Sequence, residues 1–131
     1  MKRFKVGNVV LCEHVVQGAG NKHTLVNVYT GDLLLQDVPG TIMLGLYVEI
    51  RPQPSIPPMI ELDLRVGGKP LAAVQVSLEN HDPSKPAILA IPMFPVEISE
   101  DTHLRIKLVA EGFQALTIVD RRVSKAPFPI A

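Results

Sequence analysis

The sequence predicts an all-β protein, an antiparallel β-sandwich of immunoglobulin-like architecture with about eight strands. Apolar and polar residues alternate with a period of two in several segments, which is typical of strands with one buried face. Turn residues separate these segments at close spacing. The 12 prolines and 9 glycines are spread along all 131 residues, which argues against long helices. No segment shows a sustained helical period. A β-barrel is the alternative fold that the same pattern allows.

The clearest element is a hairpin in the middle of the chain. Met59–Val66 alternates apolar residues with charged ones, so we expect one buried and one solvated face. The pair Gly67-Gly68 follows, and it readily adopts the positive φ angles of a tight turn. The return strand, Leu71–Glu79, changes parity near Ala72-Ala73, which predicts a bulge. The residues expected to be buried are Ile60, Leu62, Leu64, Val74, Val76 and Leu78, with Glu61, Asp63, Gln75 and Ser77 on the more exposed face.

Six further segments are predicted to be strands because they are rich in β-branched and apolar residues. They are Phe4–Val16, His23–Thr30, Ile42–Arg51, Ala87–Ser99, Leu104–Leu108 and Phe113–Val123. The segment Ile42–Arg51 is apolar enough to be buried on both faces at its centre. Pro92 and Pro95 favour an edge strand or a bulged segment for Ala87–Ser99, because proline cannot donate a hydrogen bond to a neighbouring strand.

Length and composition restrict the class of protein. The chain fits one domain, residues 1–131. Its 13 Lys and Arg balance 13 Asp and Glu, so no net field attracts nucleic acid or an anionic membrane. The longest uncharged runs, Val38–Val48 and Pro86–Val96, are shorter than the roughly 20 apolar residues of a membrane-spanning helix. A single cysteine and the lack of a clean signal-peptide pattern indicate a cytoplasmic protein.

The triplet Cys12-Glu13-His14 contains the groups of a nucleophile and its base. On a strand, however, Cys12 and His14 face one side and Glu13 faces the other, so adjacency does not bring the three together. We therefore expect Cys12 to be a small buried residue whose thiol reacts slowly, as free cysteine usually is.

Metal and acid–base sites find little support. The four histidines, His14, His23, His81 and His103, lack the spacings that place two imidazoles on one face. Of these, His14 and His23 could still meet across a hairpin of the first two strands. The carboxylate pairs, Glu61 with Asp63 and Glu100 with Asp101, are interpreted as solvated surface residues, because no loop has the several acidic residues of a calcium site. The sequence predicts no catalytic, cofactor-binding or metal-binding residue, and no cofactor.

Two proline-rich segments are candidate contact surfaces. Pro52–Pro58 contains a PxxP pattern of the kind that aromatic grooves bind, although a stiff connection between two strands is the favoured interpretation. The segment Ala126–Ala131 is apolar and contains two prolines, so it either frays or docks on its own domain or a neighbour.

Several short motifs resemble a family of small bacterial proteins catalogued only as a domain of unknown function. They are Leu11-Cys12-Glu13, Gly20-Asn21-Lys22, Leu25–Tyr29, Pro39 before Ile42–Ile50, Gly67-Gly68 and Ile98–Arg105. Pro52–Pro58 and the prolines at 92 and 95 depart from that pattern. The resemblance implies a β-sandwich and supplies no catalytic or ligand-binding residue.

These observations favour a non-enzymatic binding or assembly module that acts through loops or an exposed sheet face. The alternative is a small enzyme or ligand carrier with a cleft at one end of the sandwich, using His14, His23 or His81. A homodimer is expected, because Phe113–Ile118 has no device that protects a strand edge. An unidentified protein partner is expected as well, but neither nucleic acid nor a membrane.

Overall fold

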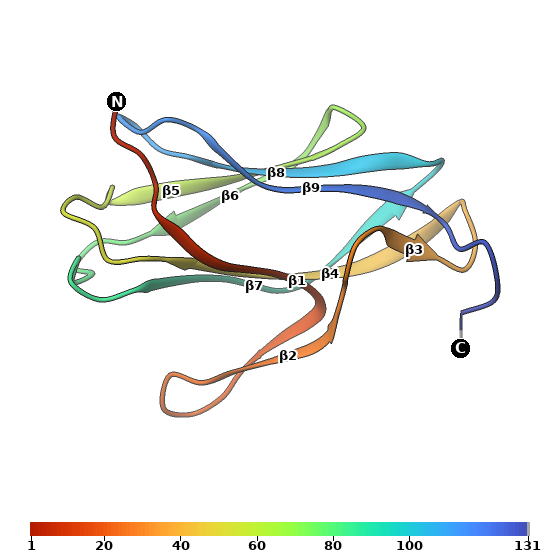
Figure 1. Ribbon diagram of the computed structural model, residues 1–131, viewed down its shortest axis with the longest axis horizontal. Coiled ribbons are helices and arrows are strands. Elements are labelled where there is room, and N and C mark those ends of the chain that lie inside the picture. The colour runs from red at the N-terminus through yellow and green to blue at the C-terminus, as the bar shows by residue number, and fades with distance from the viewer. Residues whose placement is uncertain (131) are drawn as a thin grey trace.

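The computed structural model describes residues 1–130, which form nine strands in two sheets (Figure 1). The strands are β1 (Val6–Gln17), β2 (His23–Val28), β3 (Leu33–Leu35), β4 (Gly40–Ile50), β5 (Met59–Val66), β6 (Lys69–Ser77), β7 (Ala87–Ile98), β8 (Thr102–Val109) and β9 (Leu116–Lys125). One sheet has the order β2-β1-β4-β7, and the other has the order β3-β9-β8-β5-β6. The predicted all-β sandwich is therefore confirmed. Within the described residues, no helix is long and apolar enough to cross a membrane.

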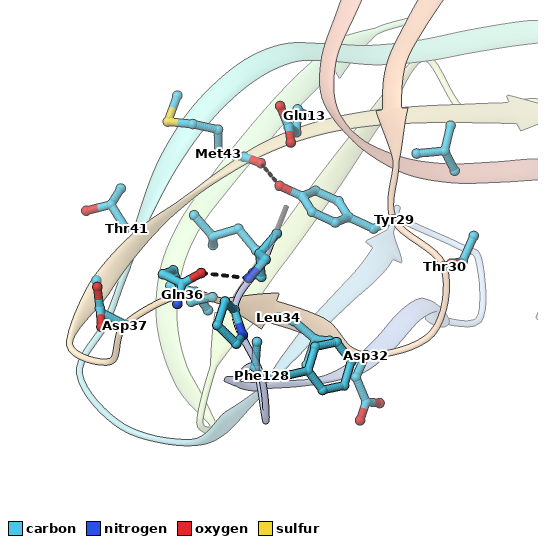
Figure 2. Close-up of a pocket in the computed structure, with 17 residues that line it drawn as sticks. Glu13, Tyr29, Thr30, Asp32, Leu34, Gln36, Asp37, Thr41, Met43 and Phe128 are labelled. Atoms are coloured by element: carbon cyan, nitrogen blue, oxygen red, sulfur yellow. Dashed lines mark hydrogen bonds between the residues drawn. The ribbon is translucent and has the colours of Figure 1, made fainter.

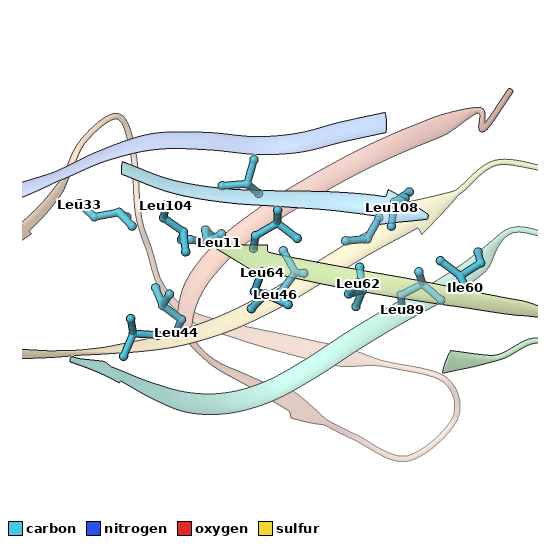
Figure 3. Packing of buried hydrophobic residues seen from close by; sticks show 14 of the residues in the cluster. Leu11, Leu33, Leu44, Leu46, Ile60, Leu62, Leu64, Leu89, Leu104 and Leu108 are labelled. Atoms are coloured by element: carbon cyan, nitrogen blue, oxygen red, sulfur yellow. The ribbon is translucent and has the colours of Figure 1, made fainter. Parts of the chain in front are cut away.

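The two sheets pack through aliphatic side chains that alternate along their strands. Figure 3 shows side chains of one sheet pointing toward those of the other. Among the residues that are almost completely buried are Leu11, Leu44, Leu46, Ile60, Leu62, Leu64, Leu89, Leu104, Ile106 and Leu108. Burying one such side chain stabilises a fold by about 1.5–3 kcal/mol relative to leaving it in water, so this layer holds the sheets together.

The predicted central hairpin is confirmed as β5 and β6, with Gly67 and Gly68 at φ angles of 59° and 78° in its turn. The bulge lies at Leu71, one residue before the predicted position, because Ala72 pairs with Leu64 and Pro70 pairs with Arg65. The inward residues of β5 are buried as predicted. Those of β6 are only half-buried, because β6 is an edge strand and has a neighbour on one side only.

Strand β1 pairs with two different strands along its length. Up to Cys12 it pairs with β4, and from Cys12 onward it pairs with β2. This second half and β2 form a two-stranded arm on the side of β4 that faces away from the other sheet (Figure 1). The imidazole of His23 packs edge-on against the ring of Tyr47 in β4, with 5.4 Å between ring centroids.

Gly45 lies where the arm crosses β4. A Cβ atom at this position would be 2.8 Å from the Pro92 carbonyl oxygen, closer than Cβ atoms approach other atoms in proteins, and 3.1 Å from the Val15 nitrogen, a tight contact. Because β7 and the arm both approach Gly45 this closely, it is buried from both sides. The prediction that the centre of Ile42–Arg51 is buried on both faces is confirmed.

The C-terminal part of the sandwich differs from the prediction. The short strand Leu33–Leu35 was not predicted, and it pairs in parallel with the end of β9, so the five-stranded sheet is mixed. The last strand begins at Leu116 rather than Phe113, whose ring instead stacks on Phe4 with centroids 4.8 Å apart. The edge predicted at Phe113–Ile118 is confirmed in part. Gly112 and Gln114 form backbone hydrogen bonds with Lys2, but among the described strands Leu116 and Thr117 pair with β8 alone, because β3 reaches only residues 123–125.

The edge position predicted for the proline-containing strand is confirmed, since β7 is the last strand of its sheet. The proline-rich loop after β4 lies outside both sheets, as expected. Gln53 fixes this loop to the N-terminal segment: its Oε1 accepts from the Lys5 N–H at 2.9 Å, and its Nε2 donates to the Ser55 carbonyl oxygen at 2.8 Å. With Gln53 and Pro57 buried, the segment fits the interpretation as a stiff connection.

Candidate functional site

A groove of about 890 Å³ lies at one end of the sandwich. Its walls come from the end of β2, from β3 and the loop after it, from the start of β4, and from the segment that follows β9 (Figure 2). The lining residues are Glu13, Val28, Tyr29, Thr30, Asp32, Leu34, Leu35, Gln36, Asp37, Gly40, Thr41, Ile42, Met43, Ala126, Phe128, Pro129 and Ile130. The groove thus joins segments that are distant in the sequence.

An arginine of β9 positions one wall of this groove. Arg121 pairs with Leu104 of β8 at a point that β3 does not reach. Its Nη1 donates to the carbonyl oxygens of Tyr29 and Gly31, at 3.0 and 3.1 Å. The turn between β2 and β3 is thereby fixed to the opposite sheet, and the groove wall that follows it is held in place.

Apolar side chains and carboxylates share the groove. Val28 and the outward residue of β3, Leu34, are 50% and 39% exposed although both are large and apolar. Three carboxylates, those of Glu13, Asp32 and Asp37, also line it. No Lys, Arg or His is found among the described lining residues. The surface therefore combines exposed apolar area with three carboxylates that form no ion pair among the described residues.

The phenol of Tyr29 is a structural group of the groove. Its hydroxyl donates to the Met43 carbonyl oxygen at 2.8 Å, which ties β2 to β4 (Figure 2). Burial, and to a smaller extent the negative charge of Glu13, raises the pKa of Tyr29 to about 12. Because the phenol keeps its proton at neutral pH and already donates it, Tyr29 is unsuited to act as a general base.

The predicted triplet around Cys12 does not form a reactive site. Cys12 is completely buried, as predicted, with its Sγ 3.8 Å from the Gly45 carbonyl oxygen. Burial raises the pKa of the thiol above its ordinary value. Glu13 points into the groove and accepts from Asn27 Nδ2 at 3.2 Å, away from the thiol. The expectation of a structural cysteine is consistent with this geometry.

The histidines are scattered over the sandwich. The possible meeting of His14 and His23 does not occur, because His14 pairs with Val26 and His23 pairs with Gln17. The ring of His81 lies 3.0 Å from the Lys85 carbonyl oxygen in the loop before β7. The described residues contain no group of three metal-binding side chains. The residues named for an end-cleft enzyme therefore do not line the groove.

The polar face of β5 is an ordinary solvated surface, as interpreted from the sequence. Arg65 Nε lies 3.3 Å from Asp63 Oδ2 on the same strand, and Gln75 Nε2 of β6 donates to Glu61 at 2.8 Å. The cross-strand pair of Gln75 with Glu61 contributes about 0.2–1 kcal/mol to sheet pairing, and a surface ion pair such as Arg65 with Asp63 contributes about 0–1 kcal/mol. They account for these carboxylates without a ligand.

Sequence reasoning did not find the groove. Its apolar wall depends on Leu33–Leu35, a run too short to show a period of two, and its acidic residues lie in turns on either side. The one feature of the sequence that could have indicated this strand is the run of three leucines between Asp32 and Asp37. It indicates a short strand only once the parallel partner in β9 is known.

No family model, curated protein or solved structure matches this chain. The resemblance to a bacterial family of unknown function therefore stays a prediction.

Proposed function

We propose that the protein is a non-enzymatic binding module whose groove takes an extended, apolar segment of another protein that carries Lys or Arg. The observation that supports it is the composition of the groove. Large apolar side chains are left exposed beside three carboxylates, and no basic side chain is present among the described lining residues. Clustered exposed apolar residues are typical of interaction surfaces, and the carboxylates select a partner of opposite charge.

The surroundings of the groove support the same proposal. Val16 and Val26 of the arm are also exposed, and Val28 continues the same strand into the groove. This strand, β2, is an edge strand, whose free backbone groups can pair with an added segment. An extended ligand could thus contact both side chains and backbone. For its location we propose the cytoplasm, supported by a single cysteine that has no second cysteine for a disulfide.

The test is a selection of peptides from a random library on the full chain, followed by titration of the enriched peptides by fluorescence anisotropy. Enriched peptides are expected to combine apolar residues with Lys or Arg. Leu34→Gln should weaken their binding at least about tenfold, which corresponds to about 1.4 kcal/mol. The matched control is Met59→Gln, which changes an equally exposed apolar residue outside the groove.

Charge gives a second readout of the same proposal. Asp32→Asn is expected to weaken the binding of cationic peptides and to reduce its dependence on salt, because one screened attraction is lost. Enrichment of acidic peptides, or equal affinity of Leu34→Gln and the unchanged chain, would contradict the proposed function.

We also propose that the chain forms a homodimer through the edge strand β6. This nine-residue strand has one charged residue, Lys69, and its first five residues are exposed. Two-fold symmetry makes two copies of an edge strand antiparallel, so β6 can pair with itself without like charges meeting at its centre. The edges β7 and β3 are less suited, because β7 contains two prolines and β3 has three residues.

Light scattering at micromolar concentration tests the dimer. The unchanged chain is expected to have twice the 14.3 kDa mass of one chain. Leu71→Lys with Ala73→Lys should give a monomer, because four ammonium groups would meet across the two-fold axis. The control, Gln114→Lys with Ala115→Lys, adds the same charge at exposed positions before β9. A monomeric unchanged chain would refute the dimer.

A further inference from the structure

The segment that follows β9, Ala126–Ile130, forms one wall of the groove, and we call it the β9 extension. The N–H of Ala126 donates to the Leu35 carbonyl oxygen at 2.7 Å, next to the parallel pairing of β3 and β9. Four residues later, the N–H of Ile130 donates to Gln36 Oε1 at 2.8 Å (Figure 2). The extension is thus attached to β3 and the loop after it by its own backbone.

Beyond Ala126, little holds the β9 extension in place. Phe128 and Ile130 are 69% and 50% exposed, so neither side chain is buried in the groove. Pro127 and Pro129 have no N–H to donate. Within residues 127–130, the hydrogen bond of Ile130 to an exposed side chain is the one described attachment. A segment with so few buried contacts detaches at a low free-energy cost.

We propose that the β9 extension occupies the position of the ligand when the groove is empty. We propose further that the ligand is an apolar segment with proline at alternate positions, and that it displaces the extension. This inference rests on the proposed function and names its ligand class. The extension lies along the groove and supplies the composition of the proposed ligand: Pro127 and Pro129 alternate with Phe128 and Ile130. Proline-spaced segments are extended before they bind, so they lose little conformational entropy on binding.

Competition from the extension should change the apparent affinity for a ligand by a measurable factor. A segment tethered next to its site acts at an effective concentration of about 1 mM. For a free peptide with a Kd of about 100 µM, a tethered competitor of equal intrinsic affinity weakens apparent binding about tenfold. Weakening the attachment of the extension should therefore increase the affinity for the same segment supplied as a separate molecule.

The experiment uses the full chain and a labelled synthetic peptide with the sequence of residues 124–131, SKAPFPIA. This probe contains the extension and the basic residue Lys125, which suits the acidic groove. Its binding is measured by anisotropy to the unchanged chain and to Phe128→Ser with Ile130→Ser. We expect saturable binding to the double variant that is about tenfold tighter than binding to the unchanged chain.

Two controls keep the result specific. Met59→Ser with Met93→Ser removes two exposed apolar side chains that do not line the groove, and this variant should bind the peptide like the unchanged chain. A probe with serine in place of its phenylalanine should bind the double variant at least about tenfold more weakly, about 1.4 kcal/mol.

The outcomes separate this inference from the function on which it rests. If library-selected peptides bind the groove but the SKAPFPIA peptide binds neither chain, or binds both chains equally, the role of the extension is refuted and the binding function stands. If no peptide binds in a way that Leu34→Gln weakens, both proposals fail.

Discussion

The guanidinium of Arg121 donates to the carbonyl oxygen of Tyr29 at 3.0 Å, a contact between residues 92 positions apart in the chain. The same nitrogen donates to the carbonyl oxygen of Gly31. One side chain of the five-stranded sheet therefore fixes the turn that leads from the four-stranded sheet into β3. The groove depends on this attachment, because its walls come from both sides of that turn.

Arg121→Met should lower the free energy of unfolding by about 1–3 kcal/mol, because it removes the charged donor of two carbonyl oxygens, and the contact with Tyr29 is partly buried. Urea denaturation followed by circular dichroism measures the change. The matched control is Arg122→Met at the next position. Arg122 pairs with Asp101 at 3.5 Å on the surface, where the side chains are 57% and 56% exposed, so the expected loss is about 0–1 kcal/mol. Equal losses in both variants would refute the role given to Arg121.

Leu62→Ala should lower the free energy of unfolding by about 2–5 kcal/mol, the usual range for a leucine in a core. Leu62 is completely buried on β5, between the two sheets (Figure 3). Met59→Ala on the same strand is the control, and its exposed side chain predicts a change within about 0.5 kcal/mol. An unchanged denaturation midpoint in Leu62→Ala would contradict the position of this residue in the core.

The core could be predicted from the sequence because it depends on a local pattern. In β5 the apolar residues recur at every second position, and a period of two has one physical interpretation when a Gly-Gly turn follows. The central strand, Ile42–Arg51, was identified as buried on both faces from its composition alone. In both segments, the pattern that predicts burial is carried by residues that are neighbours in the sequence.

The groove could not be predicted because it depends on contacts that the sequence pattern does not carry. Leu33–Leu35 becomes a strand through parallel pairing with residues 123–125, and its three residues show no period. The contact of Arg121 with Tyr29 joins residues distant in the sequence, so the spacing of neighbouring residues does not predict it. Likewise, the arm of β1 and β2 turns away from β4 at Cys12, although the sequence of β1 continues as one strand.

Gly45→Ala should destabilise the fold by about 1–3 kcal/mol, the cost of forcing extra atoms into a packed interior. The added methyl group would meet the backbone of β7 at Pro92 and that of the arm at Val15, neither of which can move as easily as a side chain. Gly18→Ala is the control, because a Cβ atom there is 3.5 Å from its nearest neighbour, the Lys22 carbonyl oxygen. If both variants have the unfolding midpoint of the unchanged chain, the arm does not cross β4 at Gly45.

The raised pKa of Tyr29 predicts how stability depends on alkaline pH. In the unfolded chain the phenol ionises near pH 10.0, whereas in the folded chain it keeps its proton until about pH 12. The folded state therefore binds more protons than the unfolded state between these values, and the free energy of unfolding falls as the pH rises through them. Cys12 acts in the same direction from about pH 9.0, because burial raises its pKa too.

Urea midpoints measured from pH 7 to pH 11.5 test this dependence. Tyr29→Phe loses the hydrogen bond to Met43, so it should be less stable at pH 7 by about 0.5–1.5 kcal/mol. Above pH 10 its stability should fall less steeply than that of the unchanged chain, because no phenol at this position ionises on unfolding. Tyr47→Phe keeps Tyr29 and should retain the steep alkaline loss. If Tyr29→Phe and the unchanged chain lose stability in parallel up to pH 11.5, the phenol of Tyr29 is not held protonated by its burial beside the groove.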